Sequence, residues 1–208
     1  MTHFISQRYK VVFMGETGVG KSSIVLRFIK DYWETNVEST IGAVFMTKTI
    51  NVNNQAIKLD LWDTAGQERY HSLAPIYYRC SDAIVIVYDI TNPSSYERAK
   101  EWLKEIRHNY KQTIPPVIYF VGNKIDLDGQ RKISVELASE YATRHELGFT
   151  EVSAKTGKGV TDLFQEVTDR IIKNIQKHKD EKKIDDQRPI DLYPPYDQNQ
   201  SYYRCCWW

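Results

Sequence analysis

Residues 15–22 read Gly-Glu-Thr-Gly-Val-Gly-Lys-Ser and follow the apolar run 9–14, so a strand is expected to lead through a glycine-rich loop into a helix. Glycines let backbone N–H groups turn towards an anion, and the helix N-terminus adds a positive dipole. In this pattern Lys21 would contact the β- and γ-phosphates, and the Ser22 hydroxyl would be a ligand of Mg²⁺. A chance glycine turn is the alternative. We expect a nucleoside triphosphate site that includes Gly15, Thr17, Gly18, Val19, Gly20, Lys21, Ser22 and Ser23.

Length and charge narrow the class of protein. With 208 residues the chain is long enough for one core and a tail but too short for two ordinary domains. Its 28 lysines and arginines are balanced by 27 aspartates and glutamates, so charge gives no reason to expect a nucleic-acid partner. No apolar run is long enough to span a bilayer, and no charged-then-apolar leader begins the chain, so we expect a soluble cytosolic protein.

Apolar and amphipathic segments alternate along the chain. Asn53-Asn54 is typical of a β-hairpin turn, and Ser134 is expected to cap a helix. The predicted strands cover residues 9–14, 44–52, 57–63, 83–89, 117–122 and 149–152, and the predicted helices cover 22–30, 94–110, 134–145 and 160–177. This alternation predicts an α/β fold: a six-stranded, mostly parallel sheet with helices on both faces and one antiparallel edge hairpin. Ligands are then expected beyond the carboxyl ends of the strands, where the glycine loop lies.

The predicted elements divide the chain into three parts. Residues 1–8 are expected to be a flexible N-terminus, and 9–177 a single nucleotide-binding domain. From residue 178 to 208 the helical period stops, and prolines and tyrosines accumulate. We interpret this last part as a disordered tail.

An acidic residue ends the third predicted strand, in the run Leu61-Trp-Asp-Thr-Ala-Gly-Gln-Glu68. Asp63 is placed to hold Mg²⁺ through water. Gly66 has no side chain, so its N–H can approach a γ-phosphate closely. The Gln67 amide is both donor and acceptor and is suited to orient an attacking water, which makes it the candidate catalytic residue. An ordinary acidic strand end followed by a glycine turn is the alternative.

The nucleotide base is expected to be read by Asn123, Lys124 and Asp126, again at a strand end. A carboxylate at Asp126 can accept hydrogen bonds from N1–H and the 2-amino group of guanine, whereas adenine would leave it unpaired. After the last strand, Ser153-Ala154-Lys155 would add a backbone N–H for the guanine O6 and a lysine stem over the ring. A solvated loop is the alternative for Asn-Lys-x-Asp. Together these motifs favour guanine.

A polar, irregular segment lies between the first predicted helix and Phe45. We expect it to contribute Trp33, Glu34 and Thr40 to the nucleotide site. Thr40 is the candidate for a second hydroxyl on Mg²⁺ and for a γ-phosphate contact, so loss of that phosphate would release the segment. Trp33 is expected to stack edgewise on the guanine, and a buried staple for the helix end is the alternative.

These residues together resemble the small Ras-like GTPases, and within them the Rab family. The resemblance covers about residues 9–177, with the nucleotide motifs in order. Ser39-Thr-Ile-Gly42, Trp62-Asp-Thr-Ala-Gly-Gln-Glu-Arg-Tyr70 and Tyr77-Tyr-Arg79 look Rab-like, and Ala43-Val-Phe45 with His71-Ser-Leu-Ala-Pro-Ile-Tyr-Tyr78 looks most like the early-endosome Rab subgroup. The resemblance implies that Phe45, Trp62 and Tyr77 form an exposed aromatic triad that effectors recognise. Core packing is the alternative for these three rings.

Two positions depart from the family pattern. Cys80 stands where the family usually has glycine, and we expect this to be a change in packing. Thr17 places a branched side chain in the phosphate loop, and we expect it to keep intrinsic hydrolysis slow. Hydrolysis should therefore need an activating protein, whose arginine can contribute on the order of 10³–10⁵ in rate.

The terminal run Cys205-Cys206-Trp207-Trp208 resembles the double-cysteine terminus of Rab proteins, in which both cysteines carry geranylgeranyl chains. Two chains make physical sense because one lipid gives only marginal membrane binding. A reading as C-a-a-X, with Cys205 alone modified, and an unmodified tail are the alternatives.

The resemblance implies a GTP-hydrolysing switch in vesicle and endosomal trafficking, with Mg²⁺ and GTP or GDP as its ligands. Its expected partners are an exchange factor, an activating protein, escort and dissociation-inhibitor proteins, effectors of the GTP form and, through the lipidated tail, a membrane, but no nucleic acid. We expect it on the cytoplasmic face of endosomal membranes, with a cytosolic pool. A GTP-binding trafficking scaffold with negligible hydrolysis is one alternative, and a P-loop ATPase or kinase is another.

Overall fold

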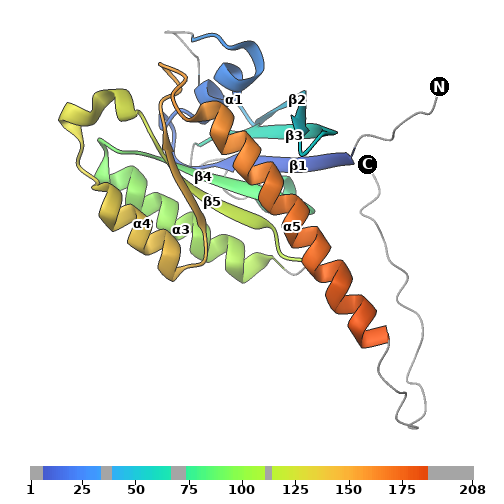
Figure 1. The fold of residues 1–208 in the computed structure, drawn as a ribbon. Helices are drawn as coiled ribbons and strands as arrows, with labels where there is room; N and C mark the ends of the chain where they lie inside the picture. The colour runs from blue at the N-terminus through green and yellow to red at the C-terminus, as the bar shows by residue number, and fades with distance from the viewer. Residues whose placement is uncertain (1–6, 34–38, 67–73, 111–113, 187–208) are drawn as a thin grey trace.

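One mixed β-sheet with helices on both faces forms the described part of the chain (Figure 1). The computed structural model describes residues 7–33, 39–66, 74–110 and 114–186, without the side chains of 182–186. The strands are β1 (Gln7–Met14), β2 (Ala43–Val52), β3 (Gln55–Thr64), β4 (Ala83–Asp89), β5 (Val117–Asn123) and β6 (Gly148–Val152). The helices are α1 (Lys21–Lys30), α2 (Ala74–Tyr78), α3 (Pro93–Asn109), α4 (Val135–Arg144), α5 (Val160–Asp186) and the 3₁₀ helix η2 (Ile125–Gln130). The predicted fold class is confirmed.

The strand order places the start of the glycine loop at the centre of the sheet. The order is β2-β3-β1-β4-β5-β6, and only the β2–β3 pair is antiparallel. The predicted hairpin turn is confirmed, since Asn53 and Asn54 both have positive φ values, 51° and 61°. β1 lies between β3 and β4, so the strands that follow it in the sequence are placed on both of its sides. The loop after β1 therefore lies where ligands of such sheets usually bind.

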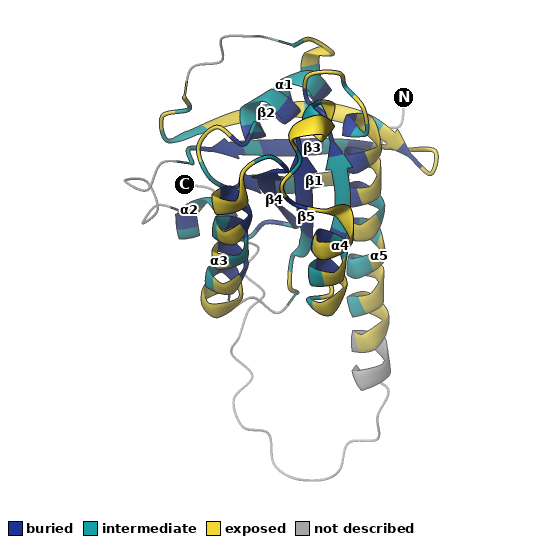
Figure 2. Ribbon diagram, turned by 90° about the vertical axis from the view of Figure 1, so that its left-hand side faces the viewer, coloured by how far each residue is buried: buried dark blue, intermediate teal, exposed yellow. Residues whose placement is uncertain are grey.

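Alternate side chains of the strands form two cores, one on each face. On β1, Val11 and Phe13 pack with α1 and α5, whereas Val12 and Met14 pack with α2, α3 and α4. Figure 2 shows the buried strands between helices whose outer faces are exposed. A sheet covered on both sides needs apolar residues at successive positions, which explains the unbroken apolar run in β4.

Helix ends follow the expected chemistry. The Ser134 hydroxyl accepts a hydrogen bond from Leu137 N at 3.2 Å, as predicted for a cap. The Asn92 side chain likewise accepts from Ser94 N at 3.0 Å, and Pro93 occupies the first turn of α3.

Most predicted boundaries differ from the structure by at most two residues, and two of the differences fall at the predicted ends of the domain. β1 begins at Gln7, inside the segment 1–8 that we expected to be flexible, and its extra residues pair with β3. α5 continues to Asp186, past the predicted end at Lys177, and projects beyond the sheet (Figures 1 and 2). Within the described part of the chain, none of the helices combines the length and hydropathy of a membrane-spanning segment.

Candidate nucleotide-binding site

A cavity of about 420 Å³ lies at the carboxyl ends of the central strands. Pockets of this size hold small ligands such as cofactors. It brings together residues from every predicted nucleotide motif. The predicted residues in its wall are Thr17, Gly18, Gly20, Lys21, Ser22, Ser23, Trp33, Thr40, Gly66, Asn123, Lys124, Asp126, Ala154 and Lys155. Gly15, Val19, Asp63 and Ser153 are not part of the wall, and all four are buried behind it.

Lys21 is a buried cation at the base of the phosphate loop. Its ammonium donates to the carbonyl oxygens of Gly15 at 3.0 Å and Glu16 at 2.9 Å. Burial lowers the pKa of Lys21 to about 8, and the neighbouring carboxylates of Asp63 and Glu16 only partly offset this. A cation so poorly solvated would gain from an anionic ligand.

Two glycines allow close approaches at this site. A Cβ at Gly20 would lie 2.3 Å from Asn123 Nδ2, where φ is also positive at 95°. A Cβ at Gly66 would lie 2.5 Å from Thr17 N, a backbone atom of the phosphate loop. The segment after β3 therefore reaches the loop only because residue 66 has no side chain.

Three oxygen-bearing side chains meet beside Lys21. Ser22 Oγ lies 2.9 Å from Thr40 Oγ1, which donates to Asp63 Oδ2 at 3.2 Å. Asp63 is buried, and its Oδ1 has no hydrogen-bond partner among the described residues. Burial raises the pKa of Asp63, against the hydrogen bonds from Ser22 and Thr40 and the charge of Lys21. Hydroxyls and a carboxylate are ligands that Mg²⁺ prefers, and a buried oxygen without a hydrogen-bond partner suits a cation ligand.

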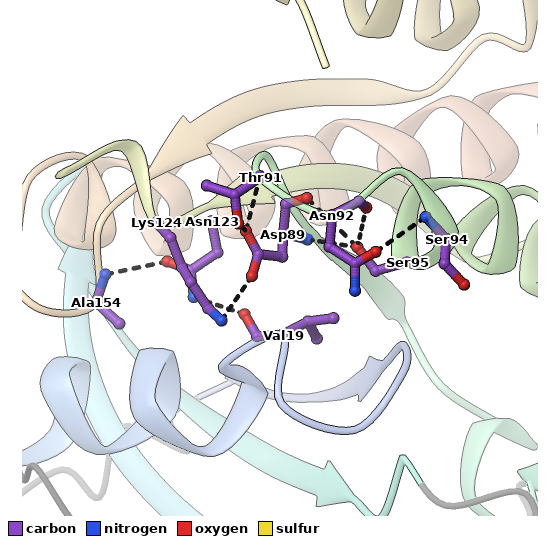
Figure 3. A network of polar contacts seen from close by, with 9 residues as sticks. All are labelled: Val19, Asp89, Thr91, Asn92, Ser94, Ser95, Asn123, Lys124 and Ala154. Carbon is purple, nitrogen blue, oxygen red and sulfur yellow. Dashed lines mark hydrogen bonds and ion pairs between the residues drawn. The ribbon is translucent and has the colours of Figure 1, made fainter. Parts of the chain in front are cut away.

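A polar network holds the predicted base-reading residues, and Figure 3 shows the part of it around Asn123 and Lys124. Asn123 Nδ2 donates to the Val19 carbonyl at 2.8 Å, and Asn123 Oδ1 accepts from Ala154 N at 3.1 Å. Ser153 Oγ donates to Asp126 Oδ1 at 2.6 Å. Asn123 therefore ties the phosphate loop to the loop after β6, and Ser153 orients the carboxylate of Asp126.

Asp89 is a member of this network that the sequence did not reveal. Its Oδ2 lies 2.6 Å from Lys124 Nζ, and its Oδ1 accepts from the Thr91 backbone and hydroxyl (Figure 3). Burial alone would raise the pKa of Asp89, but the hydrogen bonds from Lys124 and Thr91 outweigh it and lower that pKa. An acidic residue at the end of a strand beside two motif strands was the only available signal.

Trp33 lies between the core and the cavity, and its stacking on guanine stays a prediction. Its side chain is partly buried against the core under α1, and it also lines the cavity. Ser39, Thr64 and Leu127 line the cavity as well and were not predicted. Each directly adjoins a predicted site residue in the sequence, and that position was the only signal that could have identified it.

The three predicted effector aromatics form a contiguous row. Phe45 and Trp62 have ring centroids 5.2 Å apart, and Trp62 and Tyr77 6.3 Å apart. Phe45 is 43% exposed, whereas Trp62 and Tyr77 are partly buried against the core. Core packing thus accounts for part of the row but not for Phe45.

Four predicted site residues lie outside the described residues: Glu34, the candidate catalytic Gln67, and the candidate lipidation sites Cys205 and Cys206. Their roles stay predictions.

Comparisons with known proteins agree with the geometry of the site. The model of the Ras family matches residues 10–173. The chain is 50% identical over 162 residues to the Ras-related protein RABF2a of Arabidopsis thaliana. The aligned residues make up 78% of this chain and 80% of the relative.

Proposed function

The chain belongs to the Rab family of Ras-like small GTPases, and from that premise we propose that it is a GTP-dependent switch that recruits effectors to endosomal membranes. Members of this family bind guanine nucleotides with Mg²⁺ and hydrolyse GTP, so the chain is a GTPase. The residue roles, the effector surface and the compartment belong to the proposal.

We assign the phosphates to the loop 15–23, with Lys21 as the cation. Asp126 would accept hydrogen bonds from guanine. Asn123 would hold the phosphate loop and the 153–155 loop in fixed positions relative to each other. Support comes from the bonds of Asn123 to Val19 and Ala154 and from the Ser153–Asp126 bond. Since Ser153 already fixes one carboxylate oxygen, the aspartate pays little entropy on meeting the base.

The Ser22–Thr40–Asp63 cluster carries the proposal of a switch. Ser22 and Thr40 would hold Mg²⁺ directly and Asp63 through water, and the ion would neutralise charge on the phosphates. Thr40 comes from the segment between α1 and β2, yet it lies within hydrogen-bond distance of residues on α1 and β3. A ligand that binds this cluster would therefore order that segment, and loss of the γ-phosphate would release it.

Hydrolysis in this proposal depends on Gln67, which would orient the attacking water, and is slow without an activating protein. Thr17 is exposed at the wall of the cavity, where its branched side chain would crowd the γ-phosphate. The alternative is a scaffold whose hydrolysis is negligible. Single-turnover phosphate release with and without an activating protein separates the two.

The remaining partners follow from the same proposal. The row Phe45, Trp62 and Tyr77 flanks the two segments that respond to the nucleotide, and exposed aromatic surface is typical of binding sites. Geranylgeranyl chains on Cys205 and Cys206 would provide the membrane anchor. Exchange, activating, escort and dissociation-inhibitor proteins would act on this cycle, with a cytosolic pool after extraction from the endosomal membrane.

The location of the tagged full chain tests the proposal. We expect the parent and Gln67→Leu on endosomal membranes and Ser22→Asn in the cytosol, because Ser22→Asn removes the hydroxyl that holds Mg²⁺. Intact-mass measurement on protein from its native cell should show two lipid additions at Cys205 and Cys206. The same location for all three chains, or an unmodified tail, would contradict the proposal.

A further inference from the structure

A second cavity, of about 600 Å³, lies at the end of the sheet away from the phosphate loop. Val117 and Ile118, at the start of β5, line it, whereas Asn123, at the end of the same strand, lines the nucleotide cavity. α3, α5 and the loops before β5 and β6 supply its other walls.

This cavity has an apolar floor and an exposed, cationic rim. Ile106, Tyr110, Val117 and Leu147 contribute apolar surface. The cationic rim comprises Arg107, Arg170, Lys173 and Lys177, against one acidic residue in the lining, Glu146. Such a cavity fits an apolar segment that carries carboxylates.

Among the described residues, the cations of the rim contact exposed acids or neutral groups. Lys173 lies 2.6 Å from Asp169 and Lys177 4.0 Å from Glu181, but each lysine side chain is 72% exposed. Pairs this exposed contribute little and exchange partners readily. Arg107 donates to the His145 carbonyl at 2.5 Å, and Arg170 lies over the Tyr119 ring. Neither of these two contacts neutralises the guanidinium charge.

We propose that residues 191–197 of this chain, Asp-Leu-Tyr-Pro-Pro-Tyr-Asp, dock in this cavity. Two tyrosines and two prolines supply rigid apolar surface, and proline-rich segments bind apolar grooves at low entropic cost. Asp191 and Asp197 place a carboxylate at each end, where the rim offers four cations against one acid. The segment and the cavity are thus complementary in both hydropathy and charge.

The length of the chain permits this docking. α5 passes the cavity at Lys177 and ends at Asp186, about 14 Å farther at the rise of a helix. An extended chain from Asp186 to Tyr193 spans about 23 Å, enough to return to the cavity. A tether this short gives an effective concentration in the millimolar range, so a weak peptide site suffices.

Docking would fix the chain back onto the domain and leave residues 198–208 as the free tail. If Cys205 and Cys206 are lipidated as proposed above, docking shortens the tether between the domain and the membrane. The docking itself does not depend on that modification.

A peptide of residues 191–197 tests the proposal, with the full chain loaded with GDP. Tyr193→Ser/Tyr196→Ser removes the rings from the chain's own segment, and Tyr202→Ser/Tyr203→Ser is the matched control in the same tail. A fluorescent peptide should bind the first variant about fivefold more tightly than the parent, because the parent's own segment competes at millimolar effective concentration. The control should match the parent. Absence of peptide binding, or equal affinity for parent and variant, overturns the proposal.

A second arm tests the site and the intramolecular connection. In the Tyr193→Ser/Tyr196→Ser chain, Lys173→Glu/Lys177→Glu should weaken peptide binding at least tenfold, while Lys179→Glu, exposed on α5 outside the lining, should not. Amide chemical shifts of Val117 and Leu147 should differ between parent and variant equally at all protein concentrations. A difference that grows with concentration assigns the cavity to a second copy and overturns the proposal. All these readouts use GDP-loaded protein, so they stand apart from hydrolysis and membrane location.

Discussion

The Lys124 ammonium lies 2.6 Å from Asp89 Oδ2, so an ion pair joins the end of β4 to the residue after β5 at the wall of the nucleotide cavity. Lys124 adopts a left-handed backbone with φ of 72°, and the Asp89 side chain is only 10% exposed. Thr91 fixes the other carboxylate oxygen at 2.7 Å from its hydroxyl. Asp89 is therefore a rigid support for Lys124, which belongs to the motif that we expect to read the base.

Replacement of Asp89 should weaken the binding of the nucleotide. Asp89→Ala leaves Lys124 without its carboxylate, and removal of one partner of a largely buried pair costs more than the pair contributes. We expect GDP to dissociate roughly tenfold faster, equivalent to about 1.4 kcal/mol of lost binding in the dissociation rate. The release rate of a fluorescent GDP analogue measures this.

Glu97→Ala provides the control for that experiment, since Glu97 pairs with Lys100 at 2.6 Å on the same helix face but is 63% exposed. Its release rate should match the parent because exposed pairs contribute little. An unchanged rate in Asp89→Ala would mean that Lys124 needs no support from Asp89.

Replacement of Gly66 should reduce GTP hydrolysis much more than it changes GDP affinity. Gly66→Ala places a Cβ 2.5 Å from Thr17 N, and backbone there cannot yield cheaply. We expect GDP affinity to change less than about twofold while single-turnover hydrolysis falls at least tenfold, equivalent to about 1.4 kcal/mol. Gly129→Ala, where a Cβ would meet nothing within 4 Å, should behave as the parent. Equal hydrolysis in both variants would refute the role of this close approach.

Local patterns were enough to predict the sheet and most of the cavity. The turn at Asn53-Asn54 and the cap at Ser134 each depend on neighbouring residues, so sequence alone determines them. Motif spacing similarly predicted the residues of the phosphate loop and those of the base-reading loops. The contact between Ser22 and Thr40 was anticipated only through the shared metal-ligand chemistry of their hydroxyls.

Features that depend on three-dimensional packing or on helix propensity were missed. The Asp89–Lys124 pair joins two strands through tertiary structure, and no local pattern marks it. Residues 178–186 of α5 lack an apolar stripe because they project past the sheet. Good helix formers and contacts such as Lys177–Glu181 continue the helix there, and an apolar period cannot detect them.

The backbone conformation at Cys80 favours the glycine that the family usually has at this position. Its φ is 56°, a left-handed conformation that costs a residue with a Cβ roughly 1 kcal/mol, so the expected change in packing is an incomplete account. Cys80→Gly should therefore be about 1 kcal/mol more stable than Cys80→Ala, because both variants lack the sulfur of Cys80 and only alanine keeps the strain. Urea unfolding of the two GDP-loaded variants measures the difference, and equal midpoints would exclude backbone strain.

Asp82, which directly precedes β4 at the end of the sheet away from the nucleotide cavity, should make stability depend on pH. Its Oδ2 accepts from Lys10 N at 2.7 Å. Burial raises the pKa of Asp82 to about 6, and the charge of the Asp60 carboxylate raises it further. The hydrogen bond from Lys10 N and the charge of Lys10 lower this pKa but do not offset the effect of burial. The ordinary pKa of an aspartate in the unfolded chain is about 3.9. Between pH 4 and 6 the folded state therefore holds a proton that the unfolded state has lost.

The sign of the effect follows from that difference. Stability from Asp82 is fully present below about pH 4 and is lost as the pH rises through about 6, by roughly 3 kcal/mol for a shift of this size. Asp82→Asn keeps an acceptor for Lys10 N but cannot ionise. We expect the variant to match the parent near pH 4 and to become more stable than it by pH 7, measured by urea unfolding at fixed GDP. Glu140→Gln, on the exposed surface of α4, should show no such trend, and a constant difference between Asp82→Asn and the parent across this range would disprove the assignment.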